Sequence, residues 1–292
     1  LMFLAAMLLT GAVQAQTVDT VTVGTGTEPS TEVPFTNYYN YGWAEMHYTG
    51  ASIGQEGIIA GLAFDCAAVT AKACDDLRIY MGYADSLEVT EWTTPSDLTL
   101  VYSSNNVTIG GTLGWQWFDF QNPFRYEDTT RCLVVVVARH FGWTSTQKWN
   151  CTSTGQGNYT SMKVQNDNDG AQNFPAGTNW QSSNVTRESY VPNVKLRMLD
   201  LNTVVCYAPS NVATSEVLAT EATISWNSAE NSTGYEVVIG TPGFDPDTMT
   251  AISVTDTFYT FNGLSPITTY QYAVRSDCGS GSYSSWIFGT FE

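Results

Sequence analysis

The chain has 292 residues, of which 43% are hydrophobic and 13% charged, and its formal net charge is -17. This is the composition of a globular protein, and the length fits two domains of about 100 to 200 residues each. The eleven Lys and Arg residues are scattered and form no basic stripe that would neutralise phosphates, which argues against nucleic-acid binding.

The first segment, LMFLAAMLLTGAVQA, is apolar and ends with small residues at Val13 and Ala15, the two positions that a signal peptidase recognises before its cleavage site. We therefore predict a signal peptide over residues 1–15, a mature chain that begins near Gln16, and a secreted or cell-surface location. The apolar run is too short for a membrane span, and no later stretch approaches the roughly 20 apolar residues that one needs. No transmembrane segment is expected.

Segments with a period of two, rich in Val, Ile, Thr and aromatic residues, recur along the chain between clusters of turn-forming residues. Clear examples are residues 57–64, 77–81, 98–102, 132–139 and 194–199. Only residues 84–92 could hold a turn or two of helix. Many short strands without crossover helices predict an all-β protein, built as an antiparallel sandwich or jelly roll.

The run Gly114 to Phe124, GWQWFDFQNPF, has an aromatic residue at almost every position. Periodicity alone therefore cannot say which face of this strand points into a core. One face could pack inside the protein while the other binds a ligand.

Six cysteines in an exported chain are more readily disulfides than metal ligands, and the chain has only two histidines and no C-x-x-C pair. The residues between Cys132 and Cys151 read as two strand-like halves around Phe141-Gly142. A tight turn there would bring the two sulfurs directly across a hairpin. This scheme leaves Cys66 to pair with Cys74.

The loop QNDNDG, residues 165–170, has oxygen-bearing side chains at alternating positions followed by a glycine, as calcium loops do. Asp167 and Asp169 would be the ligands. The full pattern is not met, because Gln165 replaces the first Asp and Ala176 stands in place of the bidentate Glu. A polar turn is the alternative interpretation. Apart from a structural calcium ion, no cofactor is expected.

A boundary falls between residues 201 and 209, and the strand pattern then becomes more regular. Residues 222–226, 234–239, 264–274 and 285–291 resemble strands B, C, E to F, and G of a fibronectin type III domain, which we place at residues 206–292. Trp226 matches the family's buried tryptophan. Leu264 and Tyr270 belong to a segment, LSPITTY, that is similar to the family's corner motif, which implies that the Tyr270 hydroxyl fixes the connection between two strands.

Cys206 and Cys278 resemble the additional cysteine pair of many bacterial domains of this family, especially those of Bacteroidetes. The resemblance implies a disulfide between them. Closing a loop of roughly 70 residues would stabilise the domain by about 4 kcal/mol in the chain-entropy model.

Residues 16–200 resemble a β module that commonly precedes fibronectin type III repeats in Bacteroidetes surface proteins, and whose fold is similar to the jelly roll of adhesins and carbohydrate-binding modules. In that pattern Phe118 and Phe120 lie on the core side of their strand. Trp115, Trp117 and Asp119 then share the opposite face. Trp117 stands where a small polar residue is usual, so its ring invites a functional explanation.

No catalytic motif is present: the chain lacks G-x-S-x-G, H-E-x-x-H, a P-loop and G-x-G-x-x-G. His47 and His140 are interpreted as structural or exposed imidazoles. A pair of carboxylates could in principle serve a glycosidase, and those near strand ends are Asp65, Asp75, Asp76 and Asp119. Solvated loop acids are the simpler interpretation, and we predict that the chain is not an enzyme.

Aromatic residues are more abundant than two sandwich cores require, and several stand in loop-like contexts beside Asn, Gln and Asp. Exposed rings with polar neighbours suit sugar binding, although packing and protein contacts are alternatives. The candidate contacts are Trp115, Trp117, Asp119, Trp143 and Trp180.

We therefore predict a non-catalytic adhesion or glycan-binding protein whose partner is a glycan or a protein at a cell surface. The main alternative is the accessory N-terminal region of a larger secreted hydrolase or peptidase. A glycosidase formed by the first domain itself is the second alternative.

Overall fold

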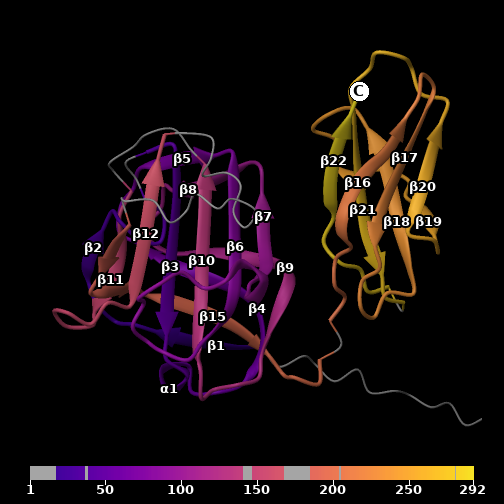
Figure 1. Cartoon of the computed structure of the whole chain (residues 1–292). Coiled ribbons are helices and arrows are strands. Elements are labelled where there is room, and N and C mark those ends of the chain that lie inside the picture. The colour runs from indigo at the N-terminus through magenta and orange to yellow at the C-terminus, as the bar shows by residue number, and fades with distance from the viewer. Residues whose placement is uncertain (1–17, 37–38, 141–146, 168–184, 204, 280) are drawn as a thin grey trace, which may run out of the picture.

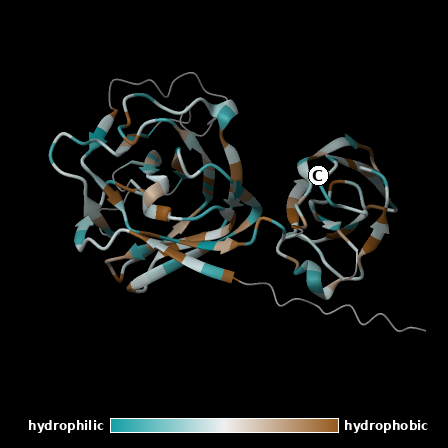
Figure 2. Ribbon diagram, turned by 90° about the horizontal axis from the view of Figure 1, so that it is seen from below, coloured by the Kyte–Doolittle hydropathy of each residue, from teal (hydrophilic) through white to brown (hydrophobic). Residues whose placement is uncertain are grey.

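A computed structural model describes residues 18–36, 39–140, 147–167, 185–203, 205–279 and 281–292. The predicted signal peptide lies outside these residues. The fold is all-β, as predicted: strands between residues 18 and 199 pair among themselves, and so do strands between residues 210 and 291 (Figure 1). Hydrophobic and hydrophilic positions alternate along many strands, as Figure 2 shows.

The first group of strands forms a sandwich of two antiparallel sheets. One sheet has the order β1-β15-β4-β11-β14, with β9 paired to β4 and β2 to β11. We call it sheet A. Its strands are β1 (Val18–Val23), β2 (Glu28–Ser30), β4 (Gly57–Cys66), β9 (Gly114–Tyr126), β11 (Trp149–Ser153), β14 (Tyr190–Pro192) and β15 (Val194–Leu199).

The facing sheet, sheet B, has the order β13-β12-β3-β10-β6-β7. Its strands are β3 (Tyr41–Tyr48), β6 (Asp76–Ala84), β7 (Thr99–Ser104), β10 (Cys132–His140), β12 (Ser161–Asn166) and β13 (Thr186–Glu188). A small two-stranded sheet is formed by β5 (Ala71–Cys74) and β8 (Val107–Gly110). A short helix, α1 (Gly50–Ile53), is capped by the Thr49 hydroxyl, which accepts from the Ser52 N–H.

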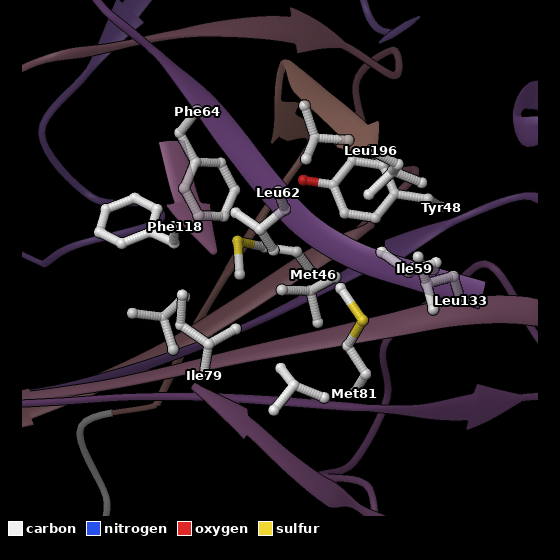
Figure 3. Close-up of a cluster of buried hydrophobic side chains, with 14 of the residues drawn as sticks. Met46, Tyr48, Ile59, Leu62, Phe64, Ile79, Met81, Phe118, Leu133 and Leu196 are labelled. Carbon is white, nitrogen blue, oxygen red and sulfur yellow. The ribbon is translucent and has the colours of Figure 1, made fainter. Parts of the chain in front are cut away.

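Side chains from the inner faces of both sheets fill the core between them, and Figure 3 shows part of it. Phe64, Phe118 and Trp149 gather there around Phe35, whose ring centroid is 4.9 Å from that of Trp149. Phe118 and Phe120 are 2% and 7% exposed, which confirms their predicted core placement. Burying one such large ring contributes about 2 to 3 kcal/mol.

Strand β10, CLVVVVARH, is apolar at successive positions because both of its faces are covered. Val135 and Val137 point into the main core, whereas Val134 and Val136 belong to a second cluster on the outer face of sheet B. Val89 and Trp92 from the connection between β6 and β7 cover that cluster. Residues 84–92, the segment that could have held a turn or two of helix, contain no helix and are extended or bent over the sheet.

Four cysteines predicted to form disulfides are free thiols in the structure: Cys66, Cys74, Cys132 and Cys151. The predicted pairing of Cys132 with Cys151 is wrong because β10 pairs with β3 and β6 in sheet B, whereas β11 belongs to sheet A. The proposed turn at Phe141-Gly142 lies outside the described residues. The pairing of Cys66 with Cys74 is wrong too: the Cys66 thiol donates to the Ala68 carbonyl, and the Cys74 thiol is directed at the Asp76 and His140 carbonyls.

A side chain joins the edges of the two sheets where β7 and β9 come together. The Gln121 amide accepts from the Ser103 N–H and donates to the Ser103 carbonyl, with both distances 3.0 Å. These backbone groups point away from β6, the hydrogen-bonded neighbour of β7. Gln121 thus takes the place that the backbone of another strand would occupy.

The second group of strands forms two further sheets, β16-β17-β20 and β19-β18-β21-β22. The strands are β16 (Ser210–Val217), β17 (Glu221–Asn227), β18 (Gly234–Gly240), β19 (Ile252–Val254), β20 (Phe258–Asn262), β21 (Tyr270–Asp277) and β22 (Ile287–Phe291). Their inner faces share one core, which contains Trp226 at 4% exposure. The Cys206–Cys278 disulfide is present, as the sequence predicted.

Candidate functional site

The outer face of sheet A carries the candidate residues of β9. Alternation turns Phe118 and Phe120 inward, so that Trp115, Trp117 and Asp119 share the opposite face of the strand. Both tryptophans are half-buried and Asp119 is exposed. The structure therefore brings these three predicted residues together on one surface.

The neighbouring strand β4 offers small residues beside the two rings. Ala63 is directly opposite Trp117, and Gly61 is opposite Asp119. A Cβ atom added to Gly61 would lie 3.0 Å from the Phe118 carbonyl and 3.3 Å from Asp119 Oδ1, so a larger residue would crowd that position. These small residues leave room for side chains of β9 to reach across β4 towards the next strand.

Strand β15, on the far side of β4, supplies two cations. Its Lys195 and Arg197 are paired with Ala63 and Gly61 in the register, and therefore lie on the same outer face. Alternating burial along VKLRML confirms that Lys195 and Arg197 point away from the core.

Each cation contacts one of the tryptophan rings. Lys195 Nζ lies 4.6 Å from the centroid of the Trp115 ring, and the Arg197 guanidinium lies 4.6 Å from that of Trp117. Arg197 also forms an ion pair with Asp119. We call Trp115, Trp117, Asp119, Lys195 and Arg197 the cation–aromatic face.

Contacts within the cation–aromatic face explain in part why a tryptophan stands at position 117, where a small polar residue is usual. Arg197 lies over the ring and pairs with Asp119, so the ring has a structural partner that the sequence did not reveal. Such cation–π contacts contribute about 0.5 to 1 kcal/mol at exposed sites. No carboxylate among the described residues pairs with the Lys195 ammonium, which contacts the Trp115 ring.

The rim of this face adds polar groups. Asp65 is opposite Trp115 and accepts from the Asn150 amide at 2.9 Å. On the other side, β1 places Thr20 opposite Arg197 and Thr22 opposite Lys195, and both threonines are exposed. The result is a sheet surface with two rings, two cations, and hydroxyl and carboxylate groups around them.

The remaining candidate contacts and calcium ligands are Trp143, Trp180, Asp167 and Asp169. Trp143, Trp180 and Asp169 lie outside the described residues. Asp167 is exposed and accepts from the Asn40 N–H at 3.0 Å. Within the described ranges, no group of three or more His, Cys, Asp or Glu side chains could hold a metal ion.

A buried polar cluster lies on the outer face of sheet B, beneath the connection between β6 and β7. Glu45 is 0% exposed and accepts from the His47 ring at 2.9 Å, and from the N–H and hydroxyl of Thr93. The other ring nitrogen of His47 is 2.8 Å from the Ser86 carbonyl. Because the cluster is sealed from solvent, its carboxylate is suited to holding the connection rather than to reacting with a substrate.

Asp75 and Asp76, two of the acids considered for a glycosidase, contact neighbouring side chains. Asp76 forms a two-pronged contact with Arg78, at 3.0 and 2.9 Å. Asp75 lies 3.9 Å from His140, whose ring stacks on that of Tyr41 with centroids 4.5 Å apart. These contacts match the interpretation of both histidines as structural groups.

Arg139 is a buried cation that sequence reasoning did not single out. Its guanidinium donates to the backbone carbonyls of Thr36, Tyr39 and Asn40, with the Asn40 contact at 2.7 Å. Burial lowers the pKa of Arg139 to about 9. Arg139 therefore anchors the segment that leads into β3.

A second group of a cation and rings is formed by Arg275 of β21 and two aromatic residues of the connection between β21 and β22. The Arg275 guanidinium is 4.2 Å from the ring centroids of both Tyr283 and Trp286. It also pairs with Glu236 at 2.7 Å, and Asp247 accepts from the Trp286 N–H at 2.9 Å. This arrangement ties β21 to β18 and to the connection that leads into β22.

The corner predicted from LSPITTY has the expected hydrogen bond. The Tyr270 hydroxyl accepts from the Ser265 N–H at 3.0 Å, and the Leu264 N–H donates to the Thr220 carbonyl at 2.9 Å. Leu264 and Tyr270 both pack against the core that contains Trp226.

Comparison with known families identifies this second part of the chain. Residues 207–290 match the model of the fibronectin type III domain, and together with the sheets and the corner this shows that they form such a domain. The family is typically a non-catalytic module. No curated protein matches the chain. The described part contains no helix with the length and hydropathy needed to span a membrane.

Three solved structures are similar to part of this chain. A computationally redesigned β-sandwich protein is 27% identical and covers 30% of this chain and 89% of its own, with a TM-score of 0.27. The fn3 domain of human collagen alpha-1(XX) chain is 16% identical, covering 31% and 86%, with a TM-score of 0.27. An Fn3-like protein from Clostridium thermocellum is 22% identical, covering 30% and 94%, with a TM-score of 0.27.

Proposed function

We propose that the chain is a non-catalytic extracellular binding protein, and that its cation–aromatic face binds a glycan bearing acidic groups. The observation that carries the proposal is the pairing of two tryptophan rings on β9 with two cations on β15. The Cys206–Cys278 disulfide and the fibronectin type III domain support an extracellular setting.

The spacing of the rings suits a chain of sugars. Trp115 and Trp117 are two positions apart on one strand, which separates them by about 7 Å. Adjacent sugar units can span such a distance, and their C–H faces pack on aromatic rings. The exposed hydroxyls of Thr20 and Thr22 and the Asp65 carboxylate provide hydrogen-bonding groups at the rim.

The cations favour acidic sugars over neutral ones. A protein of net charge -17 repels anionic ligands in general. Lys195 and Arg197 offset that repulsion locally, and the Lys195 ammonium, 4.6 Å from the centroid of the Trp115 ring, can direct N–H donors at a carboxylate or sulfate. A sugar that packs on the rings must displace the two cations from them. An acidic sugar can then pair with these cations, whereas a neutral sugar gains no such ionic contact and therefore binds less tightly.

Binding is tested by presenting residues 16–292 to an array of acidic and neutral glycans. We expect binding to uronate-containing or sulfated chains, and a loss of at least tenfold on Trp117→Ala and on Lys195→Gln. Added salt should weaken binding, since the contribution of exposed charges is screened.

The matched control is Arg187→Gln. Arg187 lies 4.9 Å from the Tyr159 ring centroid, so it forms the same kind of contact, but it belongs to β13 in sheet B. It should leave binding unchanged. Failure of the folded protein to bind any glycan, or equal loss with Arg187→Gln, would contradict the proposal.

A further inference from the structure

The two cations of the cation–aromatic face differ in their partners. Arg197 forms an ion pair with Asp119, so the two charges offset each other beside the Trp117 ring. Lys195 contacts the Trp115 ring, and no ion pair among the described residues includes its ammonium. The face therefore offers an incoming acid one unpaired cation, Lys195, although it contains two cations.

The pair of Arg197 and Asp119 can remain in place when a sugar covers Trp117. In the register Gly61 of β4 lies between the two residues, opposite Asp119 on one side and Arg197 on the other. The absence of a side chain at Gly61 lets the two charged groups meet across β4. The guanidinium has several N–H donors, so it can leave the face of the ring, keep Asp119 as its partner and still donate to a neutral hydroxyl.

Asp65 adds a negative charge at the other end of the face. It is directly opposite Trp115, and its carboxylate accepts from the Asn150 amide at 2.9 Å. None of the ion pairs within the described ranges includes Asp65. A carboxylate accepts hydrogen bonds from the hydroxyls or amides of a sugar and repels acids. Asp65 therefore limits how many acidic groups can gather around Lys195.

The balance of charges distinguishes between two kinds of acidic glycan. Lys195 and Arg197 are balanced by Asp65 and Asp119, so these four residues carry no net charge. Adjacent sugar units can reach the two rings, which are about 7 Å apart. A chain with an acid on every unit would place a second acid beside Asp119, which repels it. A chain with an acid on alternate units would place a neutral unit there instead.

We propose that the cation–aromatic face selects glycans in which acidic and neutral units alternate, with the acidic unit on Trp115 beside Lys195 and the neutral unit on Trp117. This selectivity rests on the proposed function, because the same face binds the glycan. Asp119 determines the specificity, since it neutralises Arg197 and repels an acid at the second position. A ligand with more negative charges then binds less tightly, although the face has two cations.

Isothermal titration calorimetry of residues 16–292 compares three kinds of hexasaccharide. The alternating probes are hyaluronan, unsulfated chondroitin and heparosan, the fully acidic probe is oligogalacturonate, and the neutral probe is chitohexaose. We expect at least one alternating probe to bind more tightly than oligogalacturonate by about fivefold, the effect of one exposed charge contact. Chitohexaose should bind more weakly than that alternating probe, because it has no acid for Lys195.

Asp119→Asn frees Arg197 and removes the repulsion at the second position. It should raise the affinity for oligogalacturonate about fivefold and so abolish the preference for the alternating chain. The Asp119 side chain is 70% exposed, so the substitution leaves the fold intact.

The matched control is Asp85→Asn. Asp85 pairs with Arg131 at 2.6 Å, and the Arg131 guanidinium lies 5.3 Å from the centroid of the Tyr83 ring. The control therefore makes the same change of charge in a similar group of an arginine, a carboxylate and a ring, beside the ends of β6 and β10 in sheet B. It should leave the affinities for all probes unchanged.

The outcomes separate this selectivity from the proposed function. The selectivity is overturned if oligogalacturonate binds as tightly as every alternating probe or more tightly. A gain for oligogalacturonate that is absent with Asp119→Asn, or equal with Asp85→Asn, would overturn it too, while binding of acidic glycans itself would stand. Absence of binding to every acidic probe would contradict the proposed function, and the selectivity with it.

Discussion

The buried thiols give a prediction about reactivity in which pH dependence and stoichiometry can both be measured. Burial raises the pKa of Cys74 to about 11 and that of Cys151 to about 12. It also raises the pKa of Cys66 and Cys132. Because only the thiolate attacks a disulfide reagent, a raised pKa makes the native thiol slow at neutral and mildly alkaline pH, and faster as pH rises.

The magnitude follows from the ionised fractions. At pH 8 a thiol with a pKa of about 11 is about 0.1% thiolate and one with a pKa of about 12 about 0.01%, against about 24% for an ordinary cysteine with a pKa of about 8.5. Ionisation alone therefore slows Cys74 about 200-fold and Cys151 about 2,000-fold. Exclusion of the reagent from the core slows both further.

The assay is titration with a chromogenic disulfide reagent at pH 8, followed by peptide mapping. We expect almost no rapid reaction in the native protein, and four thiols on unfolding in denaturant without reductant. Prior reduction should raise the number to six. Only two thiols in the unreduced, unfolded protein would refute the free-thiol assignment, and mapping would show which pair is joined.

Two further predictions concern the fibronectin type III domain. Replacing Cys206 and Cys278 by serine removes a link between residues 72 positions apart, and should lower the free energy of unfolding by about 4 kcal/mol in the chain-entropy model, as measured by calorimetry. A loss below about 1 kcal/mol would show that the link barely restricts the unfolded chain. Arg275→Ala should cost about 1 to 3 kcal/mol in urea unfolding, because it removes two ring contacts and leaves Glu236 unpaired. Arg125→Ala, which removes an exposed pair with Glu127, is the control and should cost much less than Arg275→Ala; equal losses would contradict this explanation.

Sequence reasoning located the strands because their patterns are local. Val194 to Leu199 alternates in sequence and in burial, and the fibronectin segments around Trp226 and Tyr270 do the same. These strand assignments need only neighbours within a few positions and the two-residue period of a strand. The core placement of Phe118 came from the family resemblance, because periodicity alone left the two faces of its strand undecided.

Contacts between residues that are far apart in the sequence could not be predicted in the same way. The two strand-like halves between Cys132 and Cys151 suggested a hairpin, but β10 and β11 belong to opposite sheets, and only the tertiary fold decides that. The partner of Asp119 is 78 residues further along the chain at Arg197. The alternation around Lys195 could have shown which residues point outward, but not that they meet the rings of β9.

The Gln121 amide bears on whether two molecules of this protein can pair through the edge of sheet B. An unpaired strand at the edge of a sheet can recruit a strand from another molecule, and repeated pairing of this kind leads to aggregates. Here the open N–H and C=O of Ser103 on β7 are already occupied by a side chain of the same molecule. At high protein concentration, a strand of another molecule therefore cannot pair with the Ser103 N–H and C=O. An unpaired strand at this position would offer a template for fibre growth.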